Sequence, residues 1–143
     1  MTALARLLAA LALALAPLPA AAQGAVAPDD ARAVRQVIEA QLDAFRQDDA
    51  PRAFSYAAPS IREAFQTPEN FLAMVRSAYP VVYRPAGVTF LIPLRADADL
   101  VQGVHLTDGA GALWLATYRL ERQPDGTWRI AGCGLQPANG TVI

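Results

Sequence analysis

The stretch that decides the fold runs from residue 113 to residue 135 and reads LWLATYRLERQPDGTWRIAGCGL. Apolar and polar residues alternate through both of its halves, which predicts two antiparallel strands joined by a tight turn. Pro124 presets the backbone for the turn, and Gly126 can take the left-handed conformation that a three-residue hairpin loop requires. This loop places Gln123 opposite Thr127, and the pairing of the two strands follows by counting outward.

That register sorts the side chains of both strands into two faces. It pairs Leu120 with Ile130 and Glu121 with Arg129, and the second pair predicts a cross-strand ion pair. The uncharged aromatic face, which we assign to the interior, carries Trp114, Ala116, Tyr118, Leu120, Trp128, Ile130, Gly132 and Gly134. The outer face carries Leu113, Leu115, Thr117, Arg119, Glu121, Arg129, Ala131, Cys133 and Leu135. The two glycines leave either a hollow or a seat for an aromatic ring in the interior.

Helical patterns precede the strands. Apolar residues recur at helical spacing over residues 34–45, after an aspartate cap at 29 or 30. A second clear helix is expected over residues 68–78, with Thr67 as its cap. Two short helical pieces are expected between them, at residues 52–56 and 61–65.

After residue 80 the apolar period changes from 3.6 to two, which predicts two more strands, at residues 88–92 and 100–107. Pro93 indicates a bulge or an edge position beside the first of them. Helices followed by a four-stranded antiparallel meander predict an α+β fold, with the N-terminal helices packed on one face of a curved sheet.

The loop that follows the strand at residues 100–107 decides where His105 points. If residues 108–111 form the whole loop, His105 faces Trp114 and shares the interior with Tyr118. A two-residue loop shifted by one pair keeps His105 on that face, whereas a three-residue loop turns it to the other face.

The first residues have the layout of a secretory signal peptide. A single positive charge at Arg6 precedes an apolar run over residues 7–15, and small residues lie just before Gln23. We therefore place a signal peptide at residues 1–22, which predicts a periplasmic or secreted protein. The apolar run is shorter than the roughly 20 residues that a membrane-spanning helix needs, so we expect no membrane association after cleavage.

The remainder of the 143-residue chain is long enough for one domain. We divide it into a linker at residues 23–29, a single α+β domain at 30–137 and a C-terminal tail at 138–143. The sequence holds 12 arginines, no lysine and 13 acidic residues. The arginines are scattered singly and form no basic run, so we expect no nucleic-acid partner.

Cys133 is the only cysteine, so no disulfide can form within the chain. In an oxidising compartment its thiol is either buried or paired with another chain. The predicted register turns Cys133 away from His105, which argues against a nucleophilic role. One cysteine and one histidine do not provide the ligands of a structural zinc site, and no phosphate-binding loop is present, so we predict neither a metal nor a cofactor.

Two resemblances follow from this order of elements. Helices followed by a meander that ends in a Trp-Arg-Ile strand resemble the cone-shaped fold of nuclear transport factor 2 and ketosteroid isomerase. More narrowly, the segments at residues 40–46, 71–76, 79–85 and 128–133 resemble a family of secreted bacterial proteins catalogued as a domain of unknown function. This second resemblance extends from about residue 30 to residue 135.

The cone-fold resemblance implies a pocket between helices and sheet near Trp114. It also implies a homodimer through the outer sheet face, with Leu113, Leu115, Thr117 and Leu135 at the contact. Cone-fold isomerases use a carboxylate base and acidic or phenolic partners in the pocket, and the interior face assigned above has no carboxylate.

The candidate ligand-binding residues are Trp114, Tyr118, His105, Tyr83 and Arg84. Hydroxyls of tyrosines can donate hydrogen bonds to a ligand oxygen, although packing in the core explains these residues as well. We expect a non-catalytic module that binds a small apolar ligand or a protein partner. The alternative is a small cofactor-independent isomerase or lyase, with His105 as general base and Tyr118 as proton donor.

Overall fold

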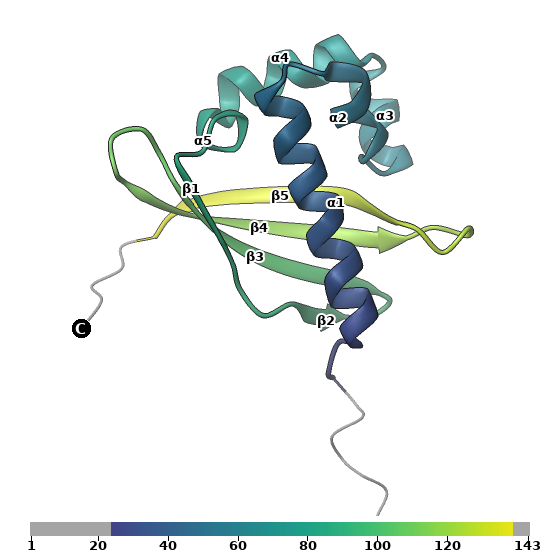
Figure 1. The fold of residues 1–143 in the computed structure, drawn as a ribbon. Helices are drawn as coiled ribbons and strands as arrows, with labels where there is room; N and C mark the ends of the chain where they lie inside the picture. The colour runs from purple at the N-terminus through teal and green to yellow at the C-terminus, as the bar shows by residue number, and fades with distance from the viewer. Residues whose placement is uncertain (1–23, 139–143) are drawn as a thin grey trace, which may run out of the picture.

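The computed structural model describes residues 24–138, and the predicted signal peptide lies outside them. Within this range helices precede strands, and the helices cover one face of a curved antiparallel sheet that does not close (Figure 1). The helices are α1 (Pro28–Arg46), α2 (Ala50–Ser55), α3 (Pro59–Phe65), α4 (Pro68–Ala78) and α5 (Pro80–Tyr83). The strands are β1 (Gly87–Phe90), β2 (Leu94–Ala96), β3 (Asp99–Thr107), β4 (Leu113–Arg122) and β5 (Trp128–Pro137). The α+β prediction is confirmed.

The two long helices begin by different means. Thr67 caps α4 as predicted, because its hydroxyl accepts a hydrogen bond from the Asn70 amide at 3.1 Å. At α1 the predicted aspartate cap is wrong: the helix already begins at Pro28, and the capping residue Ala27 has no side-chain bond. Both aspartates instead lie in the first helical turn, where their charge complements the helix dipole. The linker predicted at residues 23–29 therefore extends two residues too far.

The edge strand of the sheet is interrupted. The strand order is β1-β3-β4-β5, and β2 pairs with β3 on the same side as β1. Pro93 lies in the break between β1 and β2, in agreement with its predicted edge position. The buried amide of Gln102 fills the break by donating to the carbonyls of Leu91, at 2.7 Å, and Gly103, at 2.8 Å.

The closing hairpin has the predicted loop. Gly126 adopts φ +86°, and the Gln123 amide donates to the Thr127 carbonyl at 2.7 Å. The pairing of Leu120 with Ile130 and of Glu121 with Arg129 is also confirmed. The expected ion pair is wrong, because Glu121 binds Arg119 at 2.8 Å and Arg129 donates to the Ser55 carbonyl.

Beyond Ile130 the predicted register fails, because β5 contains a β-bulge. Leu120 pairs with Ile130 but Arg119 pairs with Gly132, which leaves Ala131 as the additional residue. A one-residue shift moves every following side chain to the opposite face. Cys133, the partner of Tyr118, and Leu135, the partner of Ala116, therefore lie on the interior face, contrary to our assignment. Gly132 and Gly134 pair with the outward residues Arg119 and Thr117.

A contact with the helical layer lies directly beside this bulge. The Ile130 amide donates to the Tyr56 carbonyl and the Ala58 amide donates to the Ile130 carbonyl, both at 2.8 Å. The link between α2 and α3 thus pairs with the outer edge of β5 at Ile130. These bonds hold the strand at the point where the bulge turns it.

The hairpin between β3 and β4 has a three-residue loop. The Asp108 amide donates to the Ala112 carbonyl at 2.9 Å, and Gly111 takes a left-handed φ of +83°. His105 consequently pairs with Leu115 on the outer face, while Leu106 pairs with Trp114. The expectation that His105 shares the interior with Trp114 and Tyr118 is wrong, because a loop of odd length reverses the alternation.

The hydrophobic core fills the space between α1 and the inner face of the sheet. The buried residues of α1 recur at helical spacing and include Val34, Ile38, Leu42 and Phe45. Facing them on the strands are Leu100, Val104, Leu106, Ala116, Tyr118, Leu120, Trp128 and Ile130. No helix within residues 24–138 has the length and apolar character that crossing a membrane would demand.

Candidate functional site

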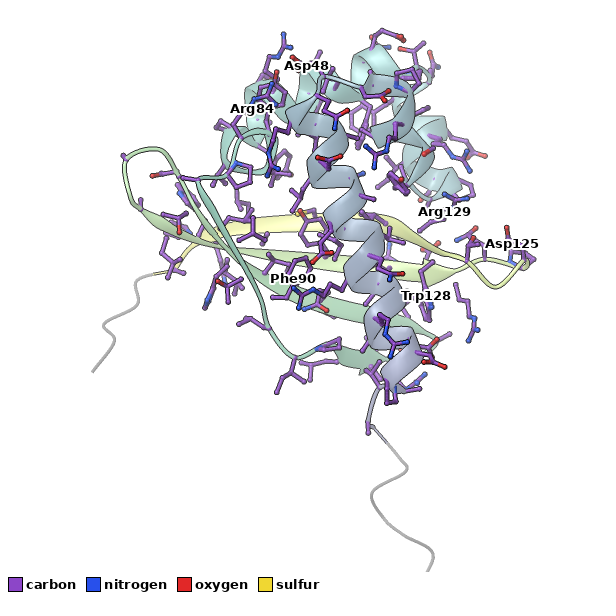
Figure 2. All side chains as sticks on the ribbon, viewed as in Figure 1. Asp48, Arg84, Phe90, Asp125, Trp128 and Arg129 are labelled. Carbon is purple, nitrogen blue, oxygen red and sulfur yellow. The ribbon has the colours of Figure 1, made fainter. Side chains whose placement is uncertain are left out.

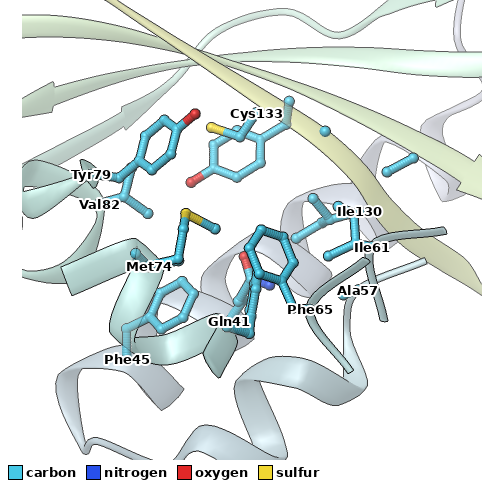
Figure 3. Close-up of a pocket in the computed structure, with 15 residues that line it drawn as sticks. Gln41, Phe45, Ala57, Ile61, Phe65, Met74, Tyr79, Val82, Ile130 and Cys133 are labelled. Atoms are coloured by element: carbon cyan, nitrogen blue, oxygen red, sulfur yellow. The ribbon is translucent and has the colours of Figure 1, made fainter. Parts of the chain in front are cut away.

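An apolar pocket of about 290 Å³ lies between the helical layer and the bulged end of the sheet. Figure 3 shows side chains from the helices, such as Phe45 and Met74, and from β5, such as Cys133, pointing toward the same space. The pocket is lined by Gln41, Phe45, Ala57, Ile61, Phe65, Phe71, Met74, Val75, Tyr79, Val82, Tyr118, Ile130, Ala131, Gly132 and Cys133.

The bulge in β5 shapes the sheet side of this pocket. Four consecutive residues, 130–133, line the pocket and include the bulged Ala131. A bulge bends its strand and re-aims the side chains around it, and here it turns Cys133 inward. The bulge therefore brings the strand at Gly132 and the Cys133 side chain to the pocket wall.

The pocket lining is uncharged. None of its residues in the described part of the chain is an aspartate, glutamate, histidine, lysine or arginine. Its polar side-chain groups are the amide of Gln41, the hydroxyls of Tyr79 and Tyr118, and the thiol of Cys133. A pocket with a mostly apolar wall and a few polar groups is typical of sites for small molecules.

Tyr118 supplies the most unusual of these groups. The residue is 1% exposed, and its hydroxyl has no hydrogen-bond partner within residues 24–138. Burial, reinforced by the neighbouring Cys133, raises the pKa of Tyr118 well above that of a free phenol. The hydroxyl therefore remains a neutral donor. A buried polar group without a partner costs about 1–3 kcal/mol, so an acceptor that enters the pocket can recover this energy.

Cys133 lies beside Tyr118 as its cross-strand partner. Burial raises the pKa of the Cys133 thiol to about 12, even though the Tyr118 hydroxyl acts in the opposite direction. At neutral pH the group is thus a protonated thiol, whereas nucleophilic attack requires the thiolate. The thiol donates a weak hydrogen bond to the Gly134 carbonyl at 3.8 Å, and Cys133 contributes an apolar surface to the pocket.

Gln41 is the buried polar residue of α1 and is 4% exposed. Its Nε2 donates to the Ala53 carbonyl of α2 at 3.2 Å. This bond fixes the orientation of the amide, so its carbonyl oxygen Oε1 is the end that remains for the pocket (Figure 3). The pocket wall therefore offers a fixed acceptor as well as the Tyr118 donor.

Of the five candidate residues from the sequence, only Tyr118 lines this pocket. Trp114 lies on the same face of the sheet, but its indole nitrogen donates to the Asp108 carboxylate at 3.0 Å. Trp114 and Arg84 both border a second groove, of about 840 Å³, at the end of the sheet near α5. His105 is on the opposite face.

Asp48 and Arg84 lie at the end of the helical layer (Figure 2), and Tyr83 belongs to the same charged cluster around Asp48. The Tyr83 hydroxyl donates to Asp48, and Arg76 and Arg84 each lie 3.3 Å from the same carboxylate. The Tyr83 hydrogen bond, followed by the arginines, lowers the pKa of Asp48. Arg84 also stacks 4.0 Å from the Tyr83 ring. These contacts tie the α1–α2 turn to α4 and α5.

Sequence reasoning missed several pocket residues, and one of them carried a signal. Gln41 falls three residues after Ile38 and four before Phe45, so it lies on the apolar stripe of a helix. A polar residue on such a stripe is a candidate for a pocket. The aromatic and aliphatic members carried no comparable signal, because core packing explains them equally well.

Among residues 24–138, histidine, cysteine, aspartate and glutamate side chains form no group of three or more that could hold a metal ion. No curated protein and no solved structure matches the chain. Residues 27–143 match DUF4864, a domain of unknown function, and this match covers most of the sequence. The chain therefore belongs to the DUF4864 family.

Proposed function

We propose that this protein binds a small, uncharged and mainly apolar molecule in the pocket between the helices and β5. The observation that carries the proposal is an uncharged lining around one buried hydroxyl, that of Tyr118, which has no partner in the described residues. Buried polar groups in folded proteins are nearly always hydrogen-bonded, and each exception needs an explanation. A bound ligand supplies the missing partner.

The size of the pocket supports a small ligand. Its volume of about 290 Å³ lies just below the range of about 300–1,000 Å³ that is typical of ligand pockets. An apolar cavity of about 150 Å³ already accommodates benzene. The pocket of this protein therefore suits a molecule with one ring and a substituent, or an aliphatic chain of similar bulk.

The chemistry of the lining favours binding over catalysis. A general base must reach the proton that it abstracts, and His105 lies on the other face of the sheet. Two of the titratable groups in the pocket, Tyr118 and Cys133, have raised pKa values and stay protonated at neutral pH. An isomerase or lyase that uses His105 thus has no support from the pocket.

A thermal-shift titration with acetophenone, whose carbonyl oxygen can accept a hydrogen bond from Tyr118, tests the proposal. This uncharged probe has the bulk that the pocket accepts, and we expect it to raise the Tm of the protein. Met74→Trp fills the pocket from α4 and should abolish the shift, because Met74 lines the pocket. Ala73→Trp is the matched control, since Ala73 is exposed on the same helix and should leave the shift intact. A shift that survives Met74→Trp, or no shift with the original protein, would contradict the proposal.

The N-terminal sequence supports action outside the cytoplasm. We propose export to the periplasm or the medium, with cleavage after Ala22, from the charged start and apolar run of the first residues. Intact-mass measurement of the exported protein should give a chain that begins at Gln23. A full-length chain recovered from the cytoplasm alone would contradict this.

We also propose that the fold is related to that of nuclear transport factor 2. The helices that cover one face of an open antiparallel sheet support this relationship.

We further propose that two copies of the protein pair through the outer sheet face. This face carries Leu113, Leu115 and Thr117, whereas the bulge removes Leu135 from it. Light scattering at micromolar concentration should give twice the mass of one chain, and a single-chain mass would exclude stable pairing.

A further inference from the structure

We propose that the ligand of this pocket is a carboxamide or lactam, a neutral molecule that carries a hydrogen-bond acceptor and a donor on an apolar body. The inference rests on the proposed binding function and adds the chemical class of the ligand. Two groups on the pocket wall carry it: the unpaired hydroxyl of Tyr118 and the carbonyl oxygen of Gln41.

The Tyr118 hydroxyl is complementary to a hydrogen-bond acceptor on the ligand. Its hydroxyl is buried, protonated and without a partner among the described residues. The weakly donating thiol of Cys133 lies on the neighbouring strand, directly across from Tyr118. The thiol donates to the Gly134 carbonyl at 3.8 Å, so the Tyr118 hydroxyl is the neutral donor that makes this side of the pocket complementary to a carbonyl oxygen.

The carbonyl oxygen of Gln41 is complementary to a hydrogen-bond donor on the ligand. Because one N–H of its amide is held by the Ala53 carbonyl, the amide cannot exchange its nitrogen and oxygen ends without breaking that bond. The carbonyl oxygen that remains accepts hydrogen bonds only. An N–H on the ligand satisfies it, and an amide carries such an N–H beside the carbonyl that Tyr118 binds.

The same walls disfavour two other classes of ligand. A carboxylate or phosphate would enter a pocket whose lining, within residues 24–138, contains no cation to compensate the buried charge. The two arginines beside Asp48 already have that carboxylate as their partner. A pure hydrocarbon fits the volume but leaves both Tyr118 and Gln41 unpaired.

Four probes with the same shape separate these classes. Benzamide carries an acceptor and a donor, acetophenone carries the acceptor alone, isopropylbenzene carries neither, and benzoate is charged. Titration followed by NMR should give the tightest binding for benzamide. Acetophenone should bind about tenfold more weakly and isopropylbenzene about tenfold more weakly again, as expected for one hydrogen bond each. Benzoate should not bind.

Matched variants assign each tenfold difference in affinity between the probes to one residue. Tyr118→Phe should make acetophenone and isopropylbenzene bind equally. Gln41→Met, which keeps the size of the side chain, should make benzamide and acetophenone bind equally. Tyr83→Phe is the control, because Tyr83 lies in the Asp48 cluster outside the pocket, and it should leave the series unchanged.

The outcomes separate this inference from the proposed function. If all three neutral probes bind equally to the original protein, the amide class is wrong and the pocket binds by apolar contact alone. If benzoate binds best, the pocket takes anions and the inference is also overturned. If no probe binds at millimolar concentration, both the inference and the proposed function fail.

Discussion

At the scale of single residues, Tyr118 lowers the stability of the unliganded protein, because its hydroxyl is buried without a hydrogen-bond partner in the described residues. Tyr118→Phe removes that hydroxyl and keeps the ring in the core. We expect the free energy of unfolding of the unliganded protein to rise by about 1 kcal/mol, measured by urea denaturation. Tyr83→Phe should have the opposite sign, since it loses hydrogen bonds to Asp48 and Arg76. A destabilised Tyr118→Phe protein would show that the hydroxyl has a partner in the empty pocket.

Cys133 gives the fold a dependence on alkaline pH. Its pKa is about 12 in the folded protein and near 9.0 when unperturbed, so the unfolded chain loses this proton first. Stability should therefore fall as pH rises from about 9 toward 12, and the raised pKa of Tyr118 acts in the same direction. Cys133→Ala should make the decline between pH 8 and 10.5 shallower in thermal melts. An unchanged slope would contradict the burial of this thiol.

At the scale of secondary-structure elements, the closing hairpin depends on Gly126. Its φ of +86° is costly for a residue with a side chain. We expect Gly126→Ala to lower the free energy of unfolding by about 1 kcal/mol in denaturant melts. Gly109→Ala is the matched control from the β3–β4 loop, because Gly109 lacks a positive φ and its Cβ would meet nothing within 4 Å. Equal effects of the two changes would contradict the loop geometry.

The helical layer depends on the Asp48 cluster, and this dependence should vary with pH. The Tyr83 hydrogen bond and the arginines lower the pKa of Asp48, so the charged carboxylate stabilises the fold above its unfolded pKa. That stabilisation is lost as pH falls through the lower folded pKa. Asp48→Asn should lower the Tm at pH 7 and flatten its decline below pH 4.

Asparagine tolerates the positive φ of +54° at position 48, so this change removes charge without backbone strain. Asp97→Asn is a matched control, since Asp97 has a similar φ of +55° in an exposed turn. It should leave both the Tm at pH 7 and its acid decline unchanged. If Asp48→Asn behaves in the same way as Asp97→Asn, the cluster contributes no stability.

Local sequence signals predicted where the helices and strands lie. Contacts between residues far apart in the sequence decided which face of the sheet each side chain occupies. The Pro124–Gly126 turn follows from residues within the loop, and so does the Thr67 cap. The bulge at Ala131 lies beside a contact with residues 56–58, far away in the sequence, so counting from the turn did not reveal it. The β3–β4 loop allowed several lengths, and only one of them turns His105 outward.

At the scale of the whole molecule, the pocket arises where the helical layer meets the bulged end of the sheet. Residues from α1, α3, α4 and β5 converge there, although the sequence separates Gln41 from Cys133 by more than half of the domain. The sequence could identify Tyr118 through its position on an aromatic strand face. It could not place Gln41, Met74 or Cys133 around the same space, because their convergence depends on how α4 and β5 pack together.

We propose that a small uncharged ligand occupies this pocket rather than the outer sheet face. Methyl NMR during a titration with acetophenone distinguishes the two locations. We expect progressive shifts of the methyl signals of Ile61, Met74 and Ile130, which line the pocket, and none for Leu94, which is 63% exposed on β2. Shifts confined to Leu94 and its neighbours, or no shifts at saturating probe, would contradict the claim.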